Sequence, residues 1–324
     1  MTKNGAFINN VSIAGILIDH TLEETTYTNS TTGDEVECIR GEMILRTADE
    51  SEHSVKFFAN KYKKDKNGNF TSDENKIYKS LMTVISDYKT LKEFPDDADF
   101  VEINSASFGI NDYISKNTGE VVSTNPISSN FINRISKESF EAASPSAKFE
   151  VEGIIAEIKD ELVKNEPTGN LNVIMNVITQ TQTGRGKESS YEIKDMFPLK
   201  LWVDKSMADD FRAAYAEGMF TKLAGVIINR TEITTVIEKQ SFGKDLNKTF
   251  MNTIRRNEIE SGSECTDLYS IGLTDDTCAA LISRRKAKLA EIKNGKKSTS
   301  ASGVATRAEK SMTNPFASKN PFAK

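Results

Sequence analysis

Two short segments of the chain carry a lysine and an aromatic ring at the same spacing. Residues 55–61 read VKFFANK and residues 199–205 read LKLWVDK, so each has a lysine at its second position and an aromatic ring at its fourth. A lysine ammonium group can bind a phosphate, and an aromatic ring offers a surface on which an unpaired base can stack. The residues concerned are Lys56, Phe58, Lys200 and Trp202.

The alternation of apolar and polar residues in both segments predicts β-strands with one buried face. When the apolar residues point into a core, the lysine and the ring point to the opposite face. Phe58 and Trp202 could instead pack under a loop or against another domain, because large rings are mostly buried in proteins. The recurrence of a lysine beside each ring favours the binding face.

Four further cations have positions suited to the same surface. Arg40 and Arg46 are predicted to point outward from the preceding strand. Lys61 and Lys205 end the two matched segments. Together with the lysine–aromatic pairs, they form a candidate set of nucleic-acid-binding residues.

A glycine-containing loop adds two more candidates, Arg185 and Lys187. The loop could follow a phosphate backbone, and it could equally be a solvated hairpin tip. It is not a P-loop, because Thr181 stands where the first motif glycine belongs and Glu188 follows the lysine in place of Ser or Thr.

The sequence contains no recognisable catalytic or metal-binding set. Cys38, Cys265 and Cys278 are odd in number and far apart, which is typical of a reducing compartment. With His20 and His53 as the only histidines, no zinc-ligand spacing can be assembled. We find no nucleotide-binding loop and no nucleophile–base pair, so we expect a protein that is not an enzyme and holds no metal or cofactor.

An internal repeat supplies the elements that must position these residues. Five segments of the first part of the chain match five segments of the second part in the same order, which predicts a domain at residues 1–140 and another at 146–262. The matched pairs are 11–18 with 149–156, 39–47 with 171–179, 55–61 with 199–205, 101–104 with 226–229 and 131–135 with 250–254.

Each copy has the same predicted order of elements: three strands, a helix and two further strands. Gly15 and Gly153 lie inside the first strands and indicate a bulge or bend. The helices are expected over 73–91, with Asp73 as the N-cap, and over 207–220. This order is that of the OB-fold, a partly open five-stranded barrel. We therefore expect a mainly β protein with two tandem OB-like domains.

The C-terminal part of the chain differs from the repeat. A helix is expected within 266–296, beginning after Thr274 as its cap, and residues 297–324 are expected to be disordered because they are rich in Ser, Ala, Thr and Lys. An Asn-Pro-Phe motif occurs twice in this tail and is typical of a docking peptide. Its residues are Pro315, Phe316, Pro321 and Phe322.

Charge is unevenly distributed along the chain. The net charge is −5, but residues 284–324 carry eleven Lys or Arg against two Asp or Glu, which leaves −14 for the rest. An acidic body predicts that any nucleic-acid site is a local groove. No apolar run approaches the roughly 20 residues that span a bilayer, and the polar N-terminus lacks a signal peptide. We therefore expect no membrane association and a cytoplasmic location.

The chain resembles the tandem OB-fold single-stranded DNA-binding proteins, especially those of bacteriophages. The resemblance covers residues 1 to about 260 and depends on the repeated strand order, the two lysine–aromatic pairs and a tail with Pro-Phe near its end. It implies a protein that coats single-stranded DNA, or RNA, during replication or recombination and recruits partner enzymes through its tail. The tail tip departs from the bacterial pattern, since Lys319 and Lys324 make it basic.

A structural or adaptor protein is the main alternative, for example a virion component whose outward aromatic residues form a protein interface. The acidic body suits this alternative somewhat better than it suits nucleic-acid binding.

Overall fold

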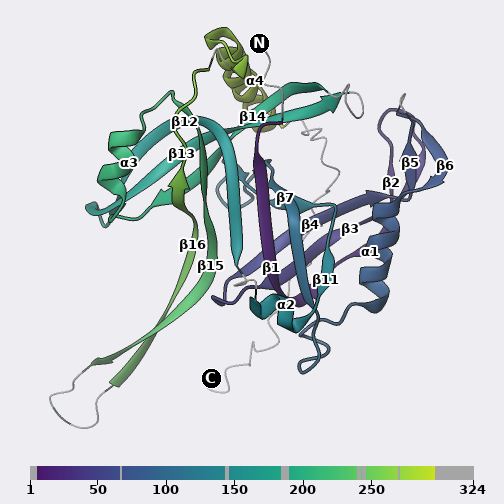
Figure 1. Cartoon of the computed structure of the whole chain (residues 1–324), viewed down its shortest axis with the longest axis horizontal. Helices are drawn as coiled ribbons and strands as arrows, with labels where there is room; N and C mark the ends of the chain where they lie inside the picture. The colour runs from purple at the N-terminus through teal and green to yellow at the C-terminus, as the bar shows by residue number, and fades with distance from the viewer. Residues whose placement is uncertain are drawn as a thin grey trace, which may run out of the picture.

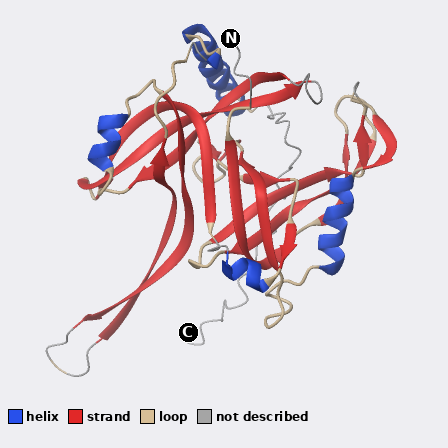
Figure 2. Cartoon of the chain, viewed as in Figure 1, coloured by secondary structure: helices blue, strands red, loops and turns tan. Residues whose placement is uncertain are grey.

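The computed structural model describes residues 6–65, 68–142, 146–183, 190–238, 242, 246–268 and 271–295. Within this part of the chain the fold is mainly β, as the sequence predicts (Figure 2). The predicted residues Arg185 and Lys187 and the tail with its two Asn-Pro-Phe motifs lie outside the described residues. None of the described helices combines the length and the apolar character needed to cross a membrane.

The described helices and strands follow one another along the chain in two similar series. The strands of the first series are β1 (Asn9–His20), β2 (Glu23–Thr28), β3 (Glu35–Arg46), β4 (Glu52–Asn60), β5 (Tyr62–Lys64), β6 (Phe70–Glu74), β7 (Phe100–Phe108), β8 (Asn111–Ile114), β9 (Val121–Thr124), β10 (Ile127–Ser129) and β11 (Asn133–Ile135). Those of the second are β12 (Ala147–Val163), β13 (Glu166–Thr183), β14 (Ser190–Val203), β15 (Phe220–Glu238) and β16 (Leu246–Gly262). The helices are α1 (Lys76–Asp87), α2 (Lys137–Ala142), α3 (Ala208–Ala214) and α4 (Asp275–Lys293).

Five strands of the first series close into a barrel. β1 pairs antiparallel with β3 and β7, and β3 pairs antiparallel with β4. β10 lies between β4 and β7, parallel to β4 and antiparallel to β7. The helix α1 joins the third barrel strand, β4, to the fourth, β7, through the small β5–β6 hairpin. This strand order and helix position are those of an OB-fold.

The second series closes through the same sequence of pairings. β12 pairs antiparallel with β13 and β15, and β13 with β14. β16 completes the circuit, antiparallel to β15 and parallel to β14 at Trp202 and Glu258. The helix α3 lies between β14 and β15, in the place that α1 has in the first barrel.

The two barrels share one sheet and one continuous apolar core. β1 pairs antiparallel with β12 from Asn9 opposite Val151 to Ile13 opposite Ala147. Buried side chains of both barrels, among them Phe57 and Phe197, belong to an apolar core that is 0–9% exposed. The barrels therefore lie side by side with a fixed orientation (Figure 1).

Gly15 and Gly153 precede bends at equivalent places in β1 and β12, the first strand of each barrel. A Cβ atom at Gly15 would lie 2.7 Å from the carbonyl oxygen of Arg46, and one at Gly153 would lie 2.3 Å from that of Asn176. The pairing register shifts a few residues further on, between Leu17 and Asp19 and between Ile155 and Glu157. The missing side chain allows the neighbouring strand to approach closely where each barrel strand curls.

The two helices of the repeat are shorter than the sequence predicts. α1 begins after Asn75, whose side chain accepts a hydrogen bond from the backbone N–H of Ile77, so the expected cap at Asp73 is wrong. Asp73 belongs to β6, because residues 70–74 pair with β5. α3 ends at Ala214, since Gly218 turns the chain with a φ of +88° before Phe220 starts β15.

The fifth matched pair of segments does not mark equivalent strands. In the first barrel the closing parallel strand is β10, with Ile127 opposite Val55, whereas residues 133–135 form β11 on the outer side of β7. In the second barrel the parallel contact falls at Glu258, and residues 250–254 lie further out on β16. The similarity of these two segments in the sequence therefore has no structural counterpart.

Two elements extend the second barrel. Beyond its contacts with the barrel, the β15–β16 hairpin continues as a twisted two-stranded arm, in which Ile233 pairs with Met251 (Figure 1). The helix α4, capped by Thr274 as predicted, packs against β14 and against the β8–β9 hairpin of the first barrel. α4 thus bridges the two barrels on the side opposite the arm.

Candidate nucleic-acid interface

A groove of about 740 Å³ lies where the outer face of the second barrel meets the first barrel. Residues of β12 to β16 line it from the second barrel, and residues of β4, β7, β9 and β10, with Asn125 and Pro126 between the last two, line it from the first. The polar and charged residues that line it include His53, Asn125, Glu161, Asn172, Lys200, Asn229, Arg255, Arg256 and Asn257. Trp202 also lines it.

Strand alternation directs Lys200 and Trp202 into this groove. Leu199 and Leu201 are fully buried in the barrel core, so the residues between and after them point outward. Lys200 is exposed, and its backbone carbonyl accepts a hydrogen bond of 2.9 Å from Asn257 on β16. The predicted outward orientation of the pair on β14 is therefore present in the fold.

Trp202 is not an open stacking surface, however. Its side chain is on the outer face of β14, but the residue is only 5% exposed. The guanidinium carbon of Arg256 lies 3.7 Å from the centroid of the indole ring. The expectation of an exposed indole is wrong, because the parallel contact between β14 and β16 places the Arg256 side chain over the ring.

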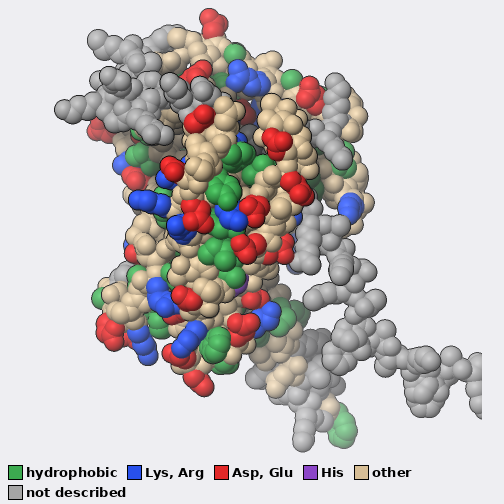
Figure 3. Space-filling model, turned by 90° about the vertical axis from the view of Figure 1, so that its right-hand side faces the viewer, with side chains coloured by type: hydrophobic (Ala, Val, Ile, Leu, Met, Phe, Trp, Pro, Cys, Tyr) green, Lys and Arg blue, Asp and Glu red, His purple; other side chains and the backbone are tan. Residues whose placement is uncertain are grey.

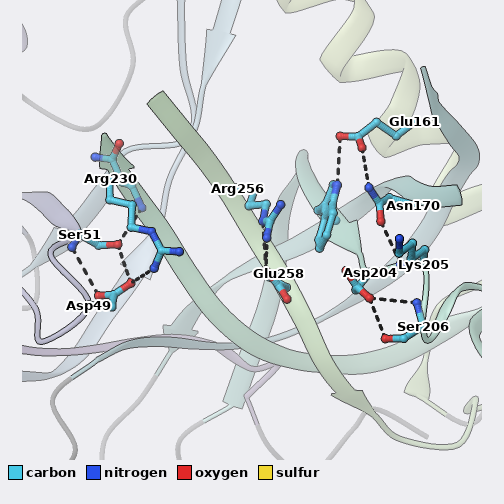
Figure 4. A network of polar contacts seen from close by, with 12 residues as sticks. Asp49, Ser51, Glu161, Asn170, Asp204, Lys205, Ser206, Arg230, Arg256 and Glu258 are labelled. Atoms are coloured by element: carbon cyan, nitrogen blue, oxygen red, sulfur yellow. Dashed lines mark hydrogen bonds and ion pairs between the residues drawn. The ribbon is translucent and has the colours of Figure 1, made fainter. Parts of the chain in front are cut away.

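A carboxylate fixes the edge of the indole. The indole Nε1 of Trp202 donates a hydrogen bond of 3.1 Å to Glu161, which also accepts bonds of 2.8 Å each from Thr168 and Asn170. Burial raises the pKa of Glu161, but these hydrogen bonds outweigh it and hold the pKa below its ordinary value. Figure 4 shows Glu161 beside Asn170, with Arg256 and Glu258 as a separate pair. A charged, well-bonded Glu161 holds the ring in one orientation.

Two cations in the groove are neutralised by no carboxylate of the described residues. Within the described part of the chain, neither Lys200 nor Arg255 makes an ion pair, and both are exposed. The Nε of Arg255 donates a bond of 3.1 Å to the side-chain oxygen of Asn229. Arg256, in contrast, is paired with Glu258 at 2.9 Å. Lys200 and Arg255 are thus available to an anionic ligand.

The groove continues into a second lobe of about 400 Å³ at the base of the arm. The two lobes share Asn229 and Arg255. Arg46 and Arg230 line the second lobe, but both are compensated: Arg46 pairs with Glu52 at 2.7 Å, and Arg230 pairs with Asp49 at 3.5 Å. The second lobe can extend a binding path, with less free positive charge than the first.

Lys56, Phe58 and Lys61, which were also predicted on the first barrel, do not line the groove. Lys56 pairs with Glu42 at 3.4 Å, and Lys61 pairs with Glu37 at 3.0 Å. Phe58 is half-buried, with its ring centroid 5.9 Å from that of Tyr27. Acidic and basic side chains intermingle over the side of the molecule that bears the first barrel (Figure 3). Neutralised lysines on such a surface offer little attraction to a polyanion.

Arg40 and Lys205 are the remaining described candidates. Arg40 is half-buried and lies directly across the strand pair from Phe58. Lys205 is exposed at the end of β14, where its backbone N–H donates to the side chain of Asn170. Neither residue lines the two lobes of the groove. Of the described predicted residues, the fold brings only Arg46, Lys200 and Trp202 to the groove.

Sequence reasoning missed Arg255, Arg256 and the asparagines that line the groove. Arg255 and Arg256 directly follow segment 250–254, and nothing in the local sequence marks this position as part of a binding face. Because β16 pairs with β14 only through the closure of the barrel, no local pattern links Arg256 to Trp202.

His53 contributes a buried neutral group to the same groove. It is 3% exposed, and burial lowers the pKa of its imidazole to about 4. Its Nε2 has no hydrogen-bond partner among the described residues. His53 is therefore uncharged at neutral pH and adds no positive charge to the site. No group of three or more metal-ligating side chains occurs among the described residues.

Comparison with known proteins identifies the family. The family model named YorF matches residues 8–295. The chain belongs to the YorF family. No curated protein sequence matches the chain.

The comparison with solved structures gives matches at low identity. The wild-type single-stranded DNA-binding protein from Thermus aquaticus is 11% identical, with a TM-score of 0.37 over 81% of this chain and 95% of that chain. A deletion mutant of the same protein gives a TM-score of 0.38, with 11% identity over 81% of this chain and 96% of that chain. A replication protein A heterotrimer bound to single-stranded DNA is 9% identical, with a TM-score of 0.23 over 87% of this chain and 70% of that chain.

Proposed function

We propose that this member of the YorF family binds single-stranded DNA without catalysis, in the groove between its two barrels. One observation carries the proposal: Lys200 and Arg255, two cations without an ion pair in the described part of the chain, lie in a groove beside the Trp202–Arg256 stack. Proteins that bind single strands without sequence preference combine such a positive groove with flat stacking groups.

The groove also has the place that the OB-fold uses for its ligands. Oligonucleotides and oligosaccharides bind the outer face of the second and third barrel strands of this fold. In the second barrel these strands are β13 and β14, which supply Asn172, Lys200 and Trp202. An acidic body favours a strand that follows this local path over one that wraps the whole surface.

In the cell, we propose that the protein coats and protects single strands during replication or recombination in the cytoplasm. Residues 1–140 and 146–262 would act as two tandem units, and RNA remains a second substrate to test. The tail residues Pro315, Phe316, Pro321 and Phe322 would recruit replication or recombination proteins. In this proposal the chain has no enzymatic activity.

A role as a structural or adaptor protein is the second candidate, and the arm favours it. Ile233, Phe250 and Met251 on the arm are 63%, 55% and 74% exposed. Exposed large apolar side chains on a projecting element are typical of a protein interface. This candidate requires no free cations in the groove, so the two functions can be separated by changing Lys200 and Arg255.

The test is the binding of a labelled oligothymidylate, followed by fluorescence anisotropy at several salt concentrations. For single strands, the logarithm of the affinity falls with the logarithm of the salt concentration by about 0.7 per phosphate contact. The double variant Lys200→Ala/Arg255→Ala should bind more weakly and lower this slope by about 1.4. The matched control is Lys79→Ala/Lys137→Ala, which removes two exposed lysines outside the groove.

Two results would contradict the proposal. Unchanged affinity and slope in the groove variant would place the binding site elsewhere. If the wild-type protein shows no salt-dependent binding at micromolar concentration, the chain is not a single-strand binder and the adaptor role is favoured.

A further inference from the structure

The most exposed layer of the ring stack in the groove is a guanidinium group. Trp202 is 5% exposed, whereas the side chain of Arg256 is 32% exposed and lies over the indole. A ligand that enters the groove therefore meets Arg256 before it meets the ring. The tryptophan that the sequence marks as the stacking platform lies one layer below the surface.

The orientation of this guanidinium is fixed by one carboxylate at its edge and by the indole ring on one face. Its Nε and its terminal nitrogen reach the carboxylate of Glu258 at 3.0 and 2.9 Å. The indole beneath it is held by Glu161, so the ring cannot rotate away without losing its hydrogen bond. A planar cation held in this way is a pre-organised surface.

From this arrangement we infer that Arg256, and not Trp202, is the group on which a nucleobase stacks. The inference rests on the proposed function. The delocalised guanidinium plane stacks on aromatic faces, and arginine planes stack with unpaired bases in nucleic-acid complexes. A base on the outer face of Arg256 would complete a column of base, guanidinium and indole, with Lys200 and Arg255 beside it for the flanking phosphates.

The charge of Arg256 is not what this role requires. Glu258 already neutralises the guanidinium, so its value to a bound strand lies mainly in its flat surface. Lysine at this position would keep the positive charge and could still pair with Glu258, but it has no plane. The substitution Arg256→Lys therefore separates stacking from phosphate attraction.

The experiment compares two oligonucleotides of equal length, one of thymidylate and one in which every base is removed to leave abasic sites. We expect Arg256→Lys to weaken binding of the thymidylate strand roughly tenfold and to leave binding of the abasic strand unchanged. The wild type should bind the thymidylate strand more tightly than the abasic strand. Arg256→Gln, whose side chain is flat but neutral and shorter, should retain more of this difference in affinity than Arg256→Lys.

The matched control is Arg134→Lys on the first barrel. Arg134 lies 4.3 Å from the ring centroid of Tyr88 and pairs with Asp99 at 2.9 Å, which is the same combination of groups outside the groove. This variant should bind both strands as the wild type does. Thermal unfolding of each variant shows whether the fold is intact.

Three outcomes overturn the inference. Equal losses on both strands after Arg256→Lys would make Arg256 a phosphate contact, and unchanged binding would give it no role. Tighter binding of the thymidylate strand would show that the guanidinium blocks access of the bases to the indole. In each case wild-type binding itself stays intact, so the proposed function survives; if the wild type binds neither strand, both fail.

Discussion

At the scale of single residues, Trp202 illustrates how a buried aromatic side chain can belong to a surface site. The indole is nearly inaccessible, yet its face supports Arg256 and its edge is bonded to Glu161. The residue therefore contributes to stability as well as to the shape of the groove. Substitutions at Trp202 must be interpreted with both contributions in mind.

We expect Trp202→Ala to lower the free energy of unfolding by about 3–5 kcal/mol, because it removes a large buried side chain and its hydrogen bond. Trp202→Phe keeps a ring beneath Arg256 and loses the bond to Glu161, so its cost should be about 1–2 kcal/mol. Urea unfolding of the two variants measures the difference. If Trp202→Ala unfolds at the wild-type urea concentration, the ring is not packed as described.

His53 predicts a pH dependence of stability. Burial lowers the pKa of its imidazole to about 4, below the ordinary value of 6.5. Between these pH values the unfolded chain binds the proton more readily than the folded chain. The contribution of the neutral His53 to stability is therefore fully present above pH 6.5 and is lost as the pH falls toward 4. From pH 7 to pH 5 the loss should be about 2 kcal/mol.

Urea unfolding at both pH values tests this, with His53→Gln as the variant that cannot titrate. The variant should lose little stability between pH 7 and pH 5. An equal loss in the variant and the wild type would assign the pH dependence to other groups.

At the scale of elements, the bends of the two first strands depend on glycine. A Cβ atom at Gly153 would lie 2.3 Å from a carbonyl oxygen, whereas one at Gly109 would have no atom nearer than 3.6 Å. Gly153→Ala should therefore lower the free energy of unfolding by about 1–3 kcal/mol, and Gly109→Ala should change it little. Thermal and urea unfolding provide the measurement, and equal effects of both substitutions would refute this account of the bend.

A buried ion pair connects α4 to the hairpin that forms part of the groove wall. Arg285 bonds both carboxylate oxygens of Asp112 at 2.6 Å, and the side chain of Asp112 is 1% exposed. Burial raises the pKa of Asp112, but bonds from Arg285 and Ser123 outweigh it and hold the pKa below its ordinary value. The end of this hairpin and the two residues after it, residues 123–126, line the groove.

Asp112→Ala should free this hairpin from α4, because it leaves Arg285 buried without a carboxylate. We expect this to lower the free energy of local opening of the hairpin by about 3 kcal/mol. Amide hydrogen exchange in β8 and β9 should therefore become roughly a hundredfold faster. The control Glu74→Ala breaks the exposed pair with Lys79 and should change exchange little. Unaltered exchange in β8 and β9 after Asp112→Ala would show that the ion pair does not hold the hairpin.

The sequence predicted much of the fold at this scale and less of the site. Alternation in 55–61 and 199–205 identified strands and their buried faces, because burial on one face of a strand is a local signal. The start of α1 was misplaced by the unrecognised β5–β6 hairpin. The fifth strand of the first barrel was misassigned because a three-residue strand carries too little pattern to recognise.

For a different reason, the sequence could not show which of the predicted cations stay unpaired or that the indole is covered. Whether a lysine is free depends on what its neighbours across the sheet provide: Lys56 has Glu42 beside it, whereas Lys200 has no carboxylate partner among the described residues. The cover over Trp202 comes from a strand that lies far away in the sequence. Such contacts follow from barrel closure and not from spacing.

At the scale of the whole molecule, two barrels of one topology contribute unequally to the candidate site. Joining β1 to β12 fixes the barrels so that the outer face of the second barrel opens on the first. The first barrel supplies a wall and Arg46, while the second supplies the free cations and the ring stack. The shared topology therefore accounts for the fold, and the differences between the two barrels account for the proposed site.

The location of the bound strand is the central claim, and photocrosslinking tests it most directly. An oligonucleotide carrying 5-iododeoxyuridine is irradiated with the full chain, and crosslinked peptides are mapped by mass spectrometry. We predict crosslinks within residues 198–205 and 253–258, which contain the groove-lining residues 200–202 of β14 and 254–257 of β16. Crosslinks confined to the arm, the first barrel's outer face or the tail, with none in these two segments, would contradict it.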